Sequence, residues 1–116
     1  MRERDRRSAL KRVLNDERRV IDFCDDQIFA FSSDRIRSAG RIAIAKLELG
    51  EEVVQMARYE AVLKSRFLLQ EQYQLPQGFS DAYVGFMHTF SVQYQQDLIG
   101  AQVEGQRLIL PGADEK

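Results

Sequence analysis

The sequence predicts an all-α protein, a small antiparallel bundle of three to four helices with a long central helix. The segment 51–73 holds no Gly or Pro, and its apolar residues recur at helical spacing. Two further stretches, at about 4–31 and 81–104, carry similar periodicity. Charged residues make up 30% of the 116-residue chain, which suits long solvated helices. A chain of this length predicts a single helical domain over 1–116, with 1–7 as a frayed basic arm and 106–116 as a C-terminal tail.

The first segment, from about Arg4 to Phe31, has a heptad-like apolar line, which favours packing of one helix on another. The line consists of Leu10, Leu14, Ile21, Cys24, Ile28 and Phe31. Cys24 is therefore expected to be a buried small hydrophobe. The residues 32–34, Ser-Ser-Asp, are good helix N-caps, so they predict a break or a sharp bend in the chain.

Residues 36–49 are ambiguous between helix and strand. Residues 41–45 alternate weakly, as in a short strand, but alanine favours helix over strand. Helix is the favoured interpretation, and the small residues in this segment would allow close helix approach. Gly50 could cap a fresh start, but we expect a helix that continues or only kinks there, leading into the central helix Glu51–Tyr73.

The central helix is predicted to end at Leu75–Gly78, and Ser80 to cap the last helix, Asp81–Glu104. That last helix is apolar on two sides, which is typical of a helix packed between two neighbours. Its aromatic residues are either the core of the monomer or a partner-binding surface, and they are the best candidates for the latter because aromatics dominate interface hot spots. They are Tyr83, Phe86, Phe90 and Tyr94.

The chain has more apolar helix surface than one short bundle can cover. The central and last helices each offer two faces, and one further helix cannot easily cover both remaining faces. The sequence therefore predicts a homodimer completed through the second face of the last helix. The predicted contributors are Val92, Ile99 and Val103.

No catalytic or metal-binding pattern is visible in the sequence. One cysteine and one histidine, Cys24 and His88, cannot supply the usual nitrogen and sulfur ligands of a metal site. His88 and Ser91 share a helix face, but Asp81 lies two turns earlier, which is poor geometry for a catalytic triad. We therefore expect no catalytic residue, no metal and no cofactor.

The resulting functional prediction is a non-enzymatic helical interaction module, such as an adaptor, assembly factor or small chaperone, with a protein partner of unknown identity. The alternative is a nucleic-acid-binding regulator that uses the Arg-rich N-terminal segment. Its contacts would be Arg2, Arg4, Arg6, Arg7, Lys11, Arg12, Arg37 and Arg41. The lone cysteine, the lack of a membrane-length apolar run and the lack of a secretory signal predict a cytoplasmic protein.

Overall fold

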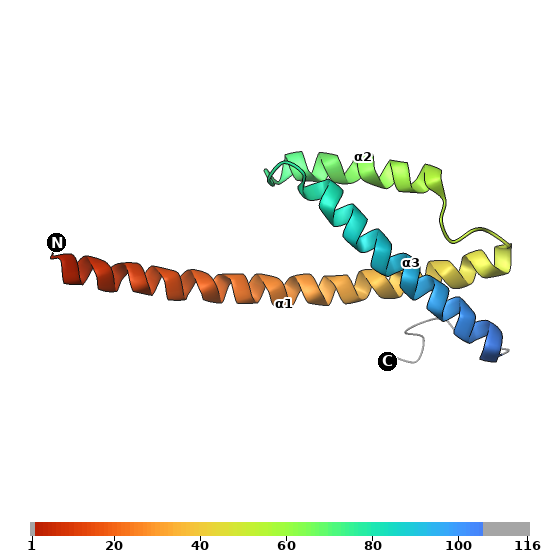
Figure 1. The fold of residues 1–116 in the computed structure, drawn as a ribbon, viewed down its shortest axis with the longest axis horizontal. Coiled ribbons are helices and arrows are strands. Elements are labelled where there is room, and N and C mark those ends of the chain that lie inside the picture. Colours follow the sequence, from red (N-terminus) through yellow and green to blue (C-terminus); the bar gives the residue numbers. More distant parts are fainter. Residues whose placement is uncertain (1, 106–116) are drawn as a thin grey trace. The chain divides into compact units, whose positions relative to one another are not determined.

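A computed structural model describes residues 2–105 and contains three α-helices in that range (Figure 1). They are α1 (Glu3–Leu49), α2 (Met56–Gln72) and α3 (Phe79–Gly105). The all-helical prediction is confirmed, and so is the helical interpretation of residues 36–49. The predicted tail 106–116 lies outside the described residues.

Helix α1 is the longest element and runs without a break through residues 32–34, where a break was predicted. Serine and aspartate cost only a few tenths of a kcal/mol in a helix interior, so capping residues need not cap when helix continues on both sides. The helix ends at Gly50 instead, at φ +71°. The N–H of Gly50 donates to Leu47 O, and the N–H of Glu51 donates to Lys46 O, which is a Schellman motif. The predicted continuation of this helix through Gly50 is wrong.

The chain divides into two units, residues 1–35 and residues 36–116. The first unit, in its described part, is a single stretch of α1 beginning at Glu3. Its large apolar side chains are exposed: Leu10, Val13, Leu14, Val20, Ile21, Phe23, Ile28, Phe29 and Phe31. Cys24 is exposed as well, contrary to its predicted burial, because a lone helix within this unit offers no surface to cover it.

In the second unit, α2 begins at Met56 and not at Glu51. Gln55 just before it is extended (φ −121°, ψ 109°), and the preceding linker is held by a hydrogen bond of 2.7 Å from Lys46 Nζ to Val53 O. The turn after α2 confirms the predicted stop at Leu75–Gly78, with Gly78 at φ +87°.

Ser80 lies inside α3 and does not cap it. Its buried N–H donates to Oε1 of Gln70 at 2.8 Å. The orphan amide of the first turn of α3 is therefore satisfied by a side chain of α2, which joins the two helices beside their turn. A cap supplied by another helix cannot be recognised from the sequence around the helix start.

The core of the second unit lies along one face of α3, which packs on α2 and crosses the C-terminal part of α1 (Figure 1). Its buried residues from α1 are Ala39, Gly40, Ala43 and Ile44, and those from α3 include Val84 and Met87. Ala43 is 0% exposed, so the small side chains allow the close helix approach that the sequence predicted. The amide Nε2 of Gln95 donates to Ala39 O at 2.9 Å in the same place.

Enlarging Ala43 tests this crossing. We expect Ala43→Leu to lower the free energy of unfolding by about 1–3 kcal/mol, because extra methyl groups have no room in a close-packed core. Urea denaturation followed by circular dichroism measures this loss. Ala45→Leu is the matched control, since Ala45 is exposed on the same helix. Equal denaturation midpoints for the two variants would show that the crossing is looser than described.

Candidate functional site

The candidate site is built from cationic and amide side chains of the second unit. Its described cations are Arg37, Arg41, Lys46, Arg58, Lys64 and Arg66. No group of three or more potential metal ligands occurs among the described residues. Two of them, Lys46 and Arg58, flank the linker between α1 and α2.

Lys46 lies in the last turn of α1, where a cation is favoured by the negative end of the helix dipole. Its half-buried ammonium uses one of three N–H donors on Val53 O, which holds the linker against the end of α1. The remaining donors can serve an acceptor of a ligand.

Arg58 lies in the first turn of α2, where a cation opposes the positive end of the helix dipole. That turn has no acidic residue, and its N-cap residue Gln55 makes no side-chain capping hydrogen bond. The side chain of Gln55 instead donates to the carboxylate of Glu51, at 3.0 Å. The start of α2 is therefore electropositive, with amide groups and a guanidinium that an anion would satisfy.

One face of α3 completes the set of polar groups. His88, Ser91 and Gln95 follow at intervals of three and four residues, so they share that face. Gln95 is 7% exposed and anchored on α1, whereas the ring of His88 packs on the ring of Tyr59 from α2. This face of α3 therefore contacts both α1 and α2.

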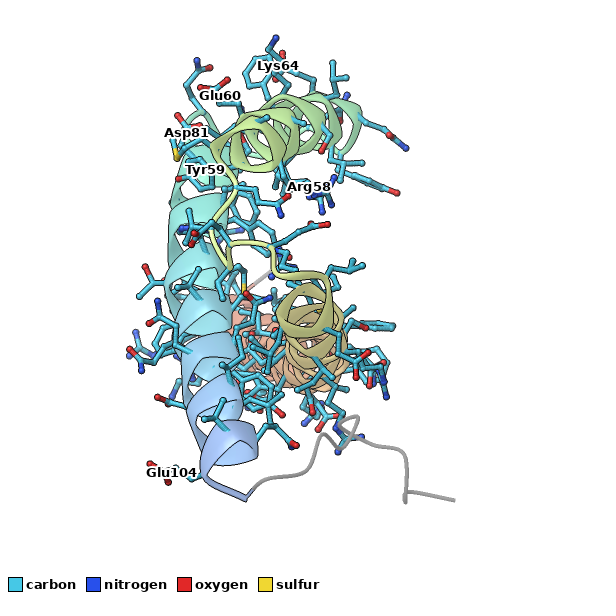
Figure 2. All side chains as sticks on the ribbon, turned by 90° about the vertical axis from the view of Figure 1, so that its right-hand side faces the viewer. Arg58, Tyr59, Glu60, Lys64, Asp81 and Glu104 are labelled. Carbon is cyan, nitrogen blue, oxygen red and sulfur yellow. The ribbon has the colours of Figure 1, made fainter. Side chains whose placement is uncertain are left out.

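Figure 2 shows how α2 presents its side chains. Arg58 and Tyr59 lie on the side of α2 that faces the rest of this unit, whereas Glu60 and Lys64 lie on the opposite side. Arg58 is exposed and Tyr59 is half-buried. Arg58 and Lys64 thus form a natural pair for comparison, one cation directed inward and one directed outward on the same helix.

The residues predicted as partner or oligomer surfaces lie elsewhere on α3. Tyr83, Phe86 and Phe90 are exposed and Tyr94 is half-buried; the rings of Phe86 and Phe90 are 4.9 Å apart. Val92 and Ile99 are half-buried, and Val103 is 63% exposed. No contact of the described chain tests these roles, so both surfaces stay predictions.

Sequence reasoning missed the candidate site for a specific reason. No motif or spacing in the sequence marks Lys46, Arg58 or Gln95 as a site residue. A cation in a first helical turn is an informative signal, but Arg58 has that position only because α2 begins at Met56. The burial of Gln95 likewise depends on the crossing with α1.

The fold and the site define a helical protein with a cation at the end of α1, a cation at the start of α2 and a buried amide on α3. The chorismate mutase type II family model matches residues 17–96, which is more than half of the chain, and the chain belongs to this family. The match includes Lys46, Arg58 and Gln95. No curated protein and no solved structure matched the chain.

This membership corrects the functional predictions. Chorismate mutase type II is an enzyme family, so the predicted non-enzymatic adaptor or chaperone is wrong. No contact of the described residues tests the nucleic-acid-binding alternative. The basic residues predicted to contact nucleic acid lie on α1 or directly before it, and all are exposed except for half-buried Arg37. They are Arg2, Arg4, Arg6, Arg7, Lys11, Arg12, Arg37 and Arg41. Within residues 2–105, no helix is long and apolar enough to span a bilayer.

Proposed function

We propose that this protein is a chorismate mutase, which isomerises chorismate to prephenate. The observation that carries the proposal is the match to the chorismate mutase type II family over residues 17–96, a span that contains the donors Lys46, Arg58 and Gln95. Chorismate is a dianion with two carboxylates joined through an enol ether. Its rearrangement breaks one C–O bond as one C–C bond forms, within a single molecule.

Such a reaction needs no nucleophile, no metal and no general base. An enzyme accelerates it by holding the substrate in its reactive conformation and by stabilising the charge that develops on the ether oxygen. Donor groups fixed by the fold suffice for both tasks. The absence of a catalytic triad or metal cluster from the sequence pattern is therefore no argument against this activity.

The geometry suggests distinct roles for the three donors. The guanidinium of Arg58 offers two parallel N–H groups, which match a carboxylate. Lys46 adds a compact positive charge. Gln95 is buried and held through one N–H on Ala39 O, so its amide is fixed before the substrate arrives. We assign Arg58 to carboxylate binding, and Lys46 with Gln95 to the oxygen atoms that gain negative charge.

The test is turnover by the purified full-length chain. Chorismate consumption is followed by ultraviolet absorbance, and prephenate is identified by chromatography because substrate and product have the same mass. The expected result is formation of prephenate well above the uncatalysed rate. A rate equal to that of buffer alone, from a chain that is folded by circular dichroism, would refute the assignment.

We further propose that the active form is a homodimer in the cytoplasm. The exposed apolar side chains of the first unit support self-association, because contiguous apolar surface on a soluble protein usually marks an interface. A second copy of the chain is the partner that the sequence predicted. The lone cysteine supports the cytoplasmic location, since it cannot form an internal disulfide.

The substitution Ile99→Asp tests the proposed dimer. If Ile99 is covered by the second copy, a charge there should cost several kcal/mol and shift the protein to monomer with helicity largely kept. Sedimentation gives the mass and circular dichroism gives the helicity. Gln96→Asp, at an exposed position one turn earlier, is the control. A folded dimer of Ile99→Asp would contradict this interface, and an unfolded monomer would place Ile99 in the core of its own chain.

A further inference from the structure

We infer that the ring contact between Tyr59 and His88 positions Arg58 for the carboxylate of the substrate. The two rings lie with centroids 4.5 Å apart and planes inclined by 58°. Tyr59 is the residue directly after Arg58, and both lie on the side of α2 that faces the rest of this unit, Tyr59 half-buried and Arg58 exposed (Figure 2). The inference rests on the proposed function and names a residue pair that the proposed chemistry does not itself require.

Arg58 needs such support because the start of α2 is weakly anchored. The linker before it is irregular, and its N-cap residue makes no side-chain hydrogen bond to the first turn. The bond from Lys46 to Val53 and the bond from Gln55 to Glu51 hold the linker, but neither bond reaches the helical part of α2. A guanidinium at this end of the helix is also opposed by the dipole, which favours fraying.

The ring contact acts on the helical part itself. Successive residues of an α-helix are separated by about 100° of rotation, so a contact that holds Tyr59 also sets the direction of Arg58. His88 stands on the same face of α3 as Gln95, which is bonded to α1. The ring pair of Tyr59 and His88 therefore sets the rotation of α2 about its axis relative to α3, the helix that carries Gln95.

The decisive experiment is a kinetic double-mutant cycle. We expect Tyr59→Leu to raise KM about tenfold with a smaller change in kcat, because misdirecting Arg58 weakens binding of the carboxylate. In an Arg58→Ala background, Tyr59→Leu should then change KM little, since the guanidinium that the ring pair positions is already absent. Tyr59→Phe and His88→Phe keep a ring pair and should retain the wild-type KM, whereas His88→Ala should behave like Tyr59→Leu.

Tyr73→Leu is the matched control, because Tyr73 is an exposed tyrosine at the other end of α2. Two results would overturn the inference. Equal effects of Tyr59→Leu in the wild-type and Arg58→Ala backgrounds would mean a general structural role. Equal losses in Tyr59→Phe and Tyr59→Leu would mean that the hydroxyl group itself contacts the substrate.

A readout without substrate separates this inference from the proposed function. Tyr59→Leu should speed hydrogen exchange at the amides of residues 59–63 relative to Tyr59→Phe, with α3 unchanged. If the wild-type chain fails to convert chorismate, the proposed function falls, and the exchange data still decide whether the ring pair holds the start of α2. Unchanged exchange in Tyr59→Leu would refute the positioning role.

Discussion

Arg58→Ala is expected to lower kcat/KM for chorismate by roughly 100- to 4,000-fold while leaving the fold intact. Removing one partner of a desolvated charge pair costs about 3–5 kcal/mol, and each 1.4 kcal/mol is a factor of ten. Arg58 is exposed in the substrate-free chain, so its removal opens no cavity. Steady-state kinetics measures the loss, and circular dichroism checks the fold.

The same substitution should slightly stabilise the protein. A cation in the first turn of α2 is unfavourable beside the helix dipole, and alanine is the best helix former. Activity and stability are thus expected to change in opposite directions, which is typical of a residue retained for function. A higher thermal midpoint together with lost activity would support this reading.

Lys64→Ala is the control for Arg58→Ala, because Lys64 lies on the outward side of the same helix (Figure 2). It should leave kcat/KM unchanged. The kcat/KM of Arg58→Lys should lie between those of Arg58→Ala and Lys64→Ala, since lysine keeps the charge and loses the planar pair of donors. Full activity in Arg58→Ala would show that Arg58 does not bind the substrate.

Gln95→Glu is expected to have the second large effect, a loss of kcat/KM of about 1,000-fold at neutral pH through two combined penalties. An ionised carboxylate cannot donate to Ala39 O, so the bond between α3 and α1 is lost. It also repels the dianionic substrate. Gln96→Glu, at an exposed position of the same helix, is the control and should be close to wild type.

The loss in Gln95→Glu should depend on pH. Burial beside a carbonyl oxygen disfavours the charged form, so the pKa of the introduced carboxyl is raised above that of an ordinary glutamate. Below the unfolded-state pKa the carboxyl is protonated in both states and can donate to Ala39 O. Stability and activity should therefore recover as the pH falls and be lost as it rises through the raised pKa. A pH-independent loss would contradict this account.

The missed enzymatic function has a chemical cause. Searches for catalytic residues look for nucleophiles, metal ligands and acid–base pairs, each of which has a recognisable spacing. A unimolecular rearrangement requires only donors and cations held in fixed positions, and these are common residues of any helix surface. Lys46 and Arg58 differ from the other cations only by where the helix ends place them.

The sequence by itself determined the class of fold and the location of the turn between α2 and α3. Helical periodicity and alanine in 36–49 predicted helix, and Leu75–Gly78 ended a helix as expected, because these are local backbone properties. Periodicity could not distinguish a core face from an exposed one. The line through Leu10 and Ile28 had the pattern of a packing seam, yet these side chains are exposed in their unit.

Only the tertiary structure decided where helices begin and which polar groups are buried. Gly50 could continue, kink or end a helix, and the Schellman bonds to Lys46 and Leu47 show that α1 ends there. Ser80 had the pattern of an N-cap, but its amide is satisfied by Gln70 from another helix. Gln95 became a candidate site residue because its partner, Ala39 O, lies 56 residues away in the chain. Such pairings form between residues that are distant in the chain, so the local sequence around either partner does not reveal them.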